Sequence, residues 1–119
     1  VIHIYNTEMK SLIKSLLFVI ILMPISSFSD SIAEGKKLTF DRKKGNCLAC
    51  HVIEDGELAG NNGPALLAMK ARFPDRDVLF QQIWDPTEKD PYSFMPPFGK
   101  HGALTRNEIN KIIDYLYTL

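Results

Sequence analysis

The pentapeptide Cys47-Leu48-Ala49-Cys50-His51 lies near the middle of a chain of 119 residues and contains both of its cysteines. Two thiols three positions apart and a histidine directly after them form the CxxCH pattern to which c-type haem is attached. Each sulfur can form a thioether to a vinyl group, and the imidazole can supply one axial ligand of the iron. The pentapeptide therefore predicts one covalently attached haem c. The rest of the chain must then supply a second axial ligand and helices that enclose an apolar disc.

The composition is that of one small domain. Fourteen basic residues balance fourteen acidic residues, so no strong field for nucleic acid or another polyanion is expected. Two cysteines in one motif are too few for a disulfide-rich secreted domain. We therefore expect the thiols to bind a cofactor.

Residues 9–29 have the pattern of a secretory signal peptide. Lys10 and Lys14 precede an apolar run at 16–25, and small residues follow up to Ser29. This run is shorter than the roughly 20 residues of a membrane span, although a retained anchor is the alternative. We predict an N-terminal extension and cleavable signal at 1–29 and a monohaem domain at 30–119. The predicted location is the periplasm, with no stable membrane span after cleavage.

Apolar periodicity predicts an all-α domain of four to five short helices. The first is expected from Asp30 or Ser31 to about Asp41, and Gly35 inside it indicates that another helix crosses closely. A short helix is expected over 65–73. A further helix is expected from Asp75 or Asp77 up to Pro86, and its predicted apolar stripe comprises Val78, Leu79, Ile83 and Trp84.

The C-terminal helix has the strongest local signals. Thr105 and Glu108 form a capping box, and Leu104 with Ile109 fits a hydrophobic staple. Apolar residues then recur with helical spacing at positions 109, 112, 113 and 116, and Tyr115 widens this face. We expect the helix to cross the first helix near Gly35.

Met95-Pro96-Pro97-Phe98-Gly99 is the best candidate for the second axial ligand. The prolines prevent helix formation and hold Met95 on a stiff segment. A methionine opposite a histidine raises the reduction potential of haem iron. His101 could also bind iron, but it ranks second, below Met95, because it lies in a polar segment. Met69 ranks third because it lies in an apolar helical pattern, where methionine usually fills a core.

Gly63-Pro64-Ala65-Leu66 closes a polar loop after the CxxCH motif. A metal-bound histidine usually donates its second ring nitrogen to an acceptor, which fixes the ring plane. The carbonyl of Pro64 is our candidate acceptor for His51, and an ordinary loop proline is the alternative interpretation.

Taken together, residues 31–119 resemble the class I cytochromes c, and among them the SoxX family, the small cytochrome subunits of SoxAX sulfur-oxidation complexes. The resemblance rests on residues 42–51, 63–76, 82–85 and 95–99, on Leu104-Thr105 and on the C-terminal residues 115–119. It implies a class I cytochrome c fold around one haem. It also implies that Cys47 and Cys50 are the thioether residues, that His51 and Met95 are the axial ligands, and that Pro64 and Leu66 contact the haem.

The resemblance also implies partners. A SoxA-like subunit with one or two haems would perform the sulfur chemistry, in which thiosulfate is joined oxidatively to a cysteine of the carrier SoxYZ. The SoxX-like chain would accept the electrons and pass them to a downstream cytochrome. It has no complete catalytic set of its own, so any activity of the L-cysteine S-thiosulfotransferase type belongs to the complex.

Three alternatives to this role remain. A free-standing periplasmic cytochrome c in respiration would have the same ligands. A thiol–disulfide oxidoreductase using the CxxC thiols would need a βαβ setting, which the helical pattern does not predict. A zinc site would need four convergent ligands.

Overall fold

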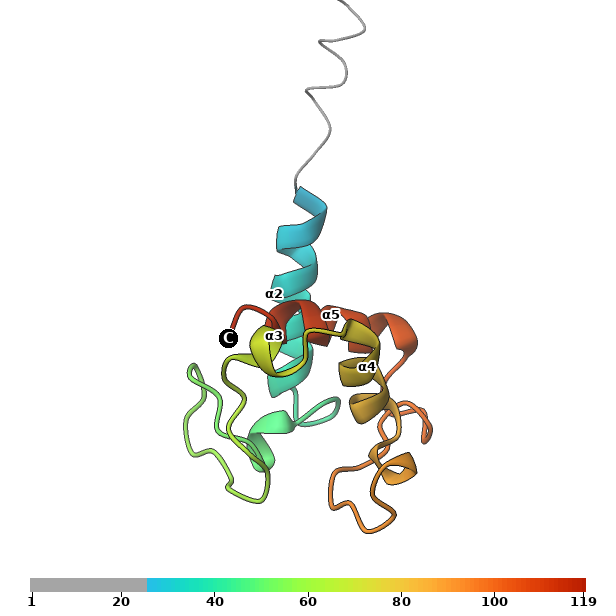
Figure 1. The fold of residues 1–119 in the computed structure, drawn as a ribbon. Helices are drawn as coiled ribbons and strands as arrows, with labels where there is room; N and C mark the ends of the chain where they lie inside the picture. The colour runs from blue at the N-terminus through green and yellow to red at the C-terminus, as the bar shows by residue number, and fades with distance from the viewer. Residues whose placement is uncertain (1–25) are drawn as a thin grey trace, which may run out of the picture.

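Four α-helices and two short 3₁₀ helices make up the part of the chain that the computed structural model describes, residues 26–119 (Figure 1). In chain order they are α2 (Ser26–Phe40), η1 (Cys47–Ala49), α3 (Met69–Arg72), α4 (Arg76–Trp84), η2 (Pro86–Glu88) and α5 (Arg106–Leu116). Residues 26–119 contain no β-strand. The prediction of an all-α domain is confirmed.

The predicted signal peptide lies outside the described residues, apart from its last four positions. These four, Ser26 to Ser29, form the first turn of α2. Within residues 26–119, no helix is both long enough and apolar enough to cross a membrane. The predicted start of the first helix at residue 30 or 31 is wrong, because α2 already includes both residues. The Ser31 hydroxyl does not cap the helix and instead donates a hydrogen bond to Asp114 of α5, at 2.5 Å.

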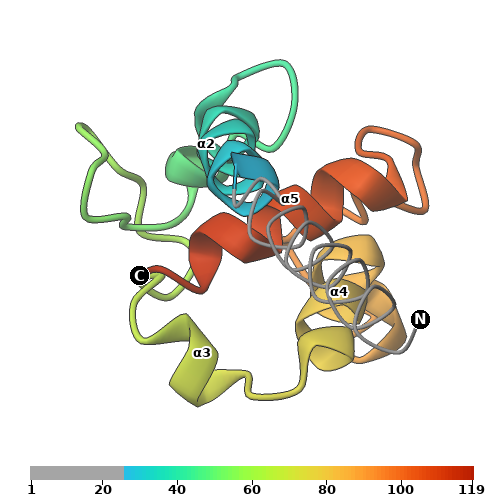
Figure 2. The same ribbon diagram turned by 90° about the horizontal axis from the view of Figure 1, so that it is seen from above.

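The first and last helices cross at Gly35, as predicted. Figures 1 and 2 show α5 lying across α2. A Cβ atom added at Gly35 would lie 1.8 Å from the backbone oxygen of Lys111. This is far inside van der Waals contact, so only glycine allows the two backbones to approach so closely. The crossing fixes the frame to which the other elements attach.

Helix α5 has both the N-terminal cap and the apolar face that the sequence predicts. The Thr105 hydroxyl accepts from the backbone N–H of Glu108 at 3.2 Å, and the Glu108 carboxylate accepts from the N–H of Thr105 at 2.8 Å. This is the predicted capping box. The buried face consists of Ile109, Ile112, Ile113, Tyr115 and Leu116.

Helix α4 begins where the sequence predicts, and its buried face differs from the predicted one at one position. The Asp75 carboxylate caps it by accepting from the N–H of Asp77 at 2.9 Å. The prediction that Val78 belongs to the apolar stripe is wrong, because its side chain is 48 % exposed. The predicted members Leu79 and Ile83 are buried, Trp84 packs against the core, and the buried Phe80 takes the place of Val78. Since α4 packs against α5 through the face centred on these residues, the neighbouring position 78 points toward solvent.

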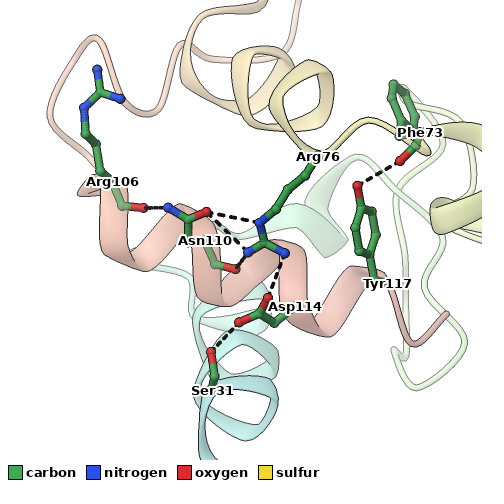
Figure 3. A network of polar contacts seen from close by, with 7 residues as sticks. All are labelled: Ser31, Phe73, Arg76, Arg106, Asn110, Asp114 and Tyr117. Atoms are coloured by element: carbon green, nitrogen blue, oxygen red, sulfur yellow. Dashed lines mark hydrogen bonds and ion pairs between the residues drawn. The ribbon is translucent and has the colours of Figure 1, made fainter. Parts of the chain in front are cut away.

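Arg76 joins α4 to α5 and, through α5, to α2 (Figure 3). Its guanidinium lies 2.8 Å from the Asp114 carboxylate and donates to the backbone oxygen of Asn110 at 2.7 Å. Asp114 also accepts the hydrogen bond from Ser31. One polar network therefore connects three helices.

The helix predicted over 65–73 is mostly absent. The backbone N–H of Leu66 donates to the Val52 oxygen at 2.8 Å, which holds the chain extended there. Ala68 then adopts a left-handed conformation with φ of 49°, so α3 begins only at Met69. A hydrogen bond to a residue 14 positions earlier in the chain takes the place of the local helical one.

Candidate functional site

The CxxCH motif is folded into a tight turn. Asn46 has a left-handed backbone conformation (φ 47°, ψ 36°), and the 3₁₀ helix η1 follows it. The Cys47 carbonyl accepts from the N–H groups of Cys50 at 3.1 Å and His51 at 2.9 Å. The backbone thereby fixes the two thiols and the imidazole relative to one another.

Three backbone hydrogen bonds attach the polar loop and the residues after it to the motif and to Val52, which directly follows the motif. The N–H of Gly60 donates to Leu48 at 2.9 Å and that of Gly63 donates to Cys50 at 2.8 Å. The third is the bond from Leu66 to Val52. The predicted polar loop is thus irregular but anchored at several points, which brings Pro64 back to His51.

The His51 ring is held from two directions. Its Nδ1 lies 2.7 Å from the Pro64 carbonyl oxygen, so the predicted contact is present. A Cβ atom at Gly63 would lie 2.4 Å from Cε1 of the ring and 2.6 Å from Nδ1. Glycine at 63 therefore leaves room for the ring, and the hydrogen bond fixes its plane. With Nδ1 donating to the carbonyl, Nε2 remains as an acceptor that can bind a metal.

Met95 lies on an irregular segment between η2 and α5. Its backbone N–H donates to the Ser93 hydroxyl at 3.2 Å. Farther on, the N–H of Leu104 donates to the Phe98 oxygen at 3.0 Å and closes the turn after the two prolines. In Figure 1 this segment and the segment that carries the CxxCH motif lie on opposite sides of the domain below α5.

A cavity of about 730 Å³ brings the predicted site residues together. Cys47, Cys50, His51, Pro64, Leu66 and Met95 all line it. Of the two lower-ranked ligands, Met69 also lines it, whereas the exposed His101 does not. The Met69 side chain is almost fully buried, and its sulfur lies 3.6 Å from Arg72 Nη1.

Sequence reasoning missed most of the cavity wall. The further apolar and aromatic lining residues include Phe73, Leu79, Ile83, Tyr92, Phe94, Phe98, Leu104, Ile112 and Leu116. The helical spacing of Ile112 and Leu116 on α5 could have indicated a shared face. Nothing local could have placed α4 and the segment around Tyr92 beside it.

The lining fits the haem that the CxxCH motif predicts. Its walls are largely apolar, as the flat ring requires, and its sulfur and imidazole groups are soft ligands suited to iron. Arg42 and Arg72 also line the cavity and can supply positive charge for the anionic carboxylates that haem carries, whereas the lining Lys44 forms an ion pair with Glu108. The donor set and the walls therefore agree with the predicted cofactor.

The Cys47 thiol does not have the electrostatic setting of a redox-active cysteine. Both cysteines are free, and burial raises the pKa of the Cys47 thiol from 9.0 to about 11. Redox-active CxxC motifs instead have a lowered thiol pKa, because the thiolate is the nucleophile. The helical fold also lacks the βαβ setting of such enzymes within residues 26–119. No group of three or more His, Cys, Asp or Glu residues in this range could hold a metal ion.

Two comparisons with known proteins bear on this site. The family described as "Cytochrome C oxidase, cbb3-type, subunit III" matches residues 30–116. An "Uncharacterized lipoprotein" of Aquifex aeolicus (strain VF5) is 41 % identical over 76 residues. The matched part covers 63 % of this chain but 37 % of that relative. The chain thus spans little more than a third of the relative's length.

Proposed function

The chain belongs to the family of cbb3-type cytochrome c oxidase subunit III and is a c-type cytochrome, a haem-binding electron-transfer protein; from this premise we propose how it holds its cofactor. One haem c is bound covalently through Cys47 and Cys50, with His51 and Met95 as the axial ligands. The supporting observation is the single cavity that all four of these residues line.

Each group has a part in holding the cofactor. The Pro64 carbonyl keeps Nδ1 of His51 protonated and leaves Nε2 free to bind iron. Leu66 contributes to the apolar wall, which keeps water away from the axial bonds. The bound haem supplies one-electron transfer. A rigid protein frame on both sides of it limits reorganisation when the charge changes.

The choice of Met95 over Met69 follows from their surroundings. Met69 is 2 % exposed within the core, and Arg72 contacts its sulfur. Met95 is partly exposed at the cavity, on a segment free of helix. Met95→Ala is expected to abolish the near-infrared sulfur–iron band while the haem stays attached. Met69→Leu is the matched control and should keep the band. A band that survives Met95→Ala and disappears in Met69→Leu would reverse the assignment.

For the physiological role, we propose the electron-accepting subunit of a SoxAX-type thiosulfate-oxidising complex, with a SoxA-like cytochrome as partner. The sequence resemblance over residues 71–76 and 95–99 supports this proposal. In the first stretch, the Phe73 backbone oxygen accepts a hydrogen bond from Tyr117 and Arg76 forms an ion pair with Asp114. These residues therefore also have a role in the fold.

A free-standing respiratory carrier is the second candidate. The family match fits a respiratory role, because that family is named for an oxidase subunit. Purification of the tagged protein from cells grown on thiosulfate separates the two. Copurification of a haem protein that carries a ligating cysteine, and of its SoxYZ-like carrier, supports the sulfur-oxidation role. A chain that remains alone beside an expressed SoxA-like protein contradicts that role and leaves the cytochrome assignment intact.

We also propose export to the periplasm. The signal-like pattern at 9–29 supports export, as does the name of the matched relative, a lipoprotein. N-terminal sequencing of the protein from the periplasmic fraction is expected to begin at Asp30. Recovery of the full-length chain from the membrane fraction would support the retained anchor instead.

A further inference from the structure

Asp85 lies where α4 ends and the Met95-bearing segment begins, and its side chain is 2 % exposed. One carboxylate oxygen, Oδ1, accepts hydrogen bonds from the backbone N–H of Thr87, at 3.1 Å, and from the Thr87 hydroxyl. The other oxygen, Oδ2, accepts from Nζ of Lys100 at 2.6 Å. The two oxygens therefore serve different parts of the chain.

These contacts lie on both sides of Met95 in the chain. We define the Met95 loop as residues 87–100, so Thr87 and Lys100 are its two ends. The backbone N–H groups of Gly99 and Lys100 both donate to the Trp84 oxygen, each at 3.1 Å. Both ends of the loop therefore close on two consecutive residues, Trp84 and Asp85.

In the interior of the Met95 loop, the hydrogen bonds lie mainly within the loop itself, while the side chains of Met95 and Phe98 pack against the core. The N–H of Ser93 donates to the Asp90 oxygen at 3.0 Å, and Met95 donates to Ser93. Among the ion pairs of residues 26–119, the pair of Lys100 with Asp85 is the one that joins this loop to another element. The position of Met95 therefore depends on how the two ends are held as well as on its packing against the core.

We propose that Asp85 is a positioning residue whose carboxylate clasps both ends of the Met95 loop and so keeps the Met95 sulfur at the cavity. This inference rests on the proposed role of Met95 as an axial ligand. The hydrogen bond from Lys100, and then that from Thr87, lower the pKa of Asp85, while Asp85 raises the pKa of Lys100. Both groups are therefore charged at neutral pH, as the clasp requires.

Loosening the clasp should make the sixth coordination position available to competing ligands. A ligand that binds only when the loop is open has an apparent affinity proportional to the open population. Exogenous imidazole measures that population directly. A purely structural role for Asp85 would lower thermal stability without changing this affinity.

The test compares the wild-type holoprotein with Asp85→Asn and Lys100→Gln. Lys100 is more than half exposed, so its variant is expected to fold even if Asp85→Asn does not. Lys111→Gln is the matched control, because it removes an ion pair of the same 2.6 Å length, with Glu34, that joins α5 to α2. The readouts are amide hydrogen exchange in residues 88–100, the sulfur–iron band and imidazole affinity.

We expect both clasp variants to exchange faster in residues 88–100, to lose intensity in the sulfur–iron band and to bind imidazole roughly tenfold more tightly. Lys111→Gln should match the wild type in all three. Unchanged amide exchange in both variants overturns the inference about Asp85 and leaves the assignment of Met95 intact. Faster exchange with an unchanged imidazole affinity and an unchanged sulfur–iron band has the same consequence. A wild-type protein without the band overturns the assignment of Met95, and the positioning role falls with it.

Discussion

Gly63→Ala tests the proposed role of the His51 ring with a change of one methyl group. The added Cβ would lie 2.4 Å from Cε1 of the ring, whereas ordinary contacts begin at 3.4 Å. The ring must therefore move by about 1 Å (3.4 − 2.4). The same Cβ would lie 2.6 Å from Nδ1, the ring atom that lies 2.7 Å from the Pro64 oxygen. We therefore expect the displacement of the ring to break this hydrogen bond.

The lost hydrogen bond should raise the reduction potential. Donation to a carbonyl makes the imidazole a stronger electron donor, which favours the oxidised iron. We take the loss of the hydrogen bond to change the free-energy difference between the oxidised and reduced states by the net contribution of one hydrogen bond, about 0.5–1.5 kcal/mol. The reduction potential then rises by roughly 20–65 mV for a one-electron couple. A potentiometric titration followed optically measures this shift.

Asn61→Ala is the control for Gly63→Ala, because it changes an exposed residue of the same loop that does not line the cavity. It should leave the potential at the wild-type value. A Gly63→Ala protein with wild-type potential and wild-type yield of holoprotein would refute the reasoning about the ring.

Three further predictions concern stability. Gly35→Ala should lower the melting temperature, because the overpacking cost against the Lys111 backbone, typically about 1–3 kcal/mol, exceeds the gain of about 1 kcal/mol in helix propensity; a higher melting temperature would contradict the close crossing. The hydrogen bond from Lys44 lowers the pKa of Glu108 below its ordinary 4.5, so its stabilisation is complete above that pH and is lost as the pH falls through the lower folded-state value. Glu108→Gln should therefore flatten the acid side of a plot of melting temperature against pH, and an unchanged slope would count against the ion pair. The Tyr115 hydroxyl is buried without a hydrogen-bond partner among residues 26–119, and burial raises its pKa to about 12. Tyr115→Phe should leave the melting temperature unchanged or higher, and a marked loss would indicate a missing partner.

Features set by neighbouring residues were predictable from the sequence. The capping box and apolar period of α5 involve residues at most a few positions apart, and α5 forms as predicted. Gly35 indicated a close crossing because glycine is costly inside a helix without such a reason. The contact of His51 with Pro64 followed from the need of a ligating imidazole for an acceptor.

Features set by contacts distant in the chain were not predictable in the same way. The helix expected over 65–73 is shortened by the hydrogen bond from Leu66 to Val52, which no local pattern records. Val78 and Phe80 have similar apolar character, and only the placement of α4 on α5 decides that Phe80 is buried. The double role of the Asp85 carboxylate likewise needs Lys100 to return to the end of α4.

The mass of the intact purified protein under denaturing conditions tests the central claim most directly. The account predicts the mass of the processed chain plus one haem, with the haem on the peptide that contains Cys47 and Cys50. Cys47→Ala and Cys50→Ala should each reduce the attached fraction. A colourless protein with the mass of the bare processed chain would contradict the account.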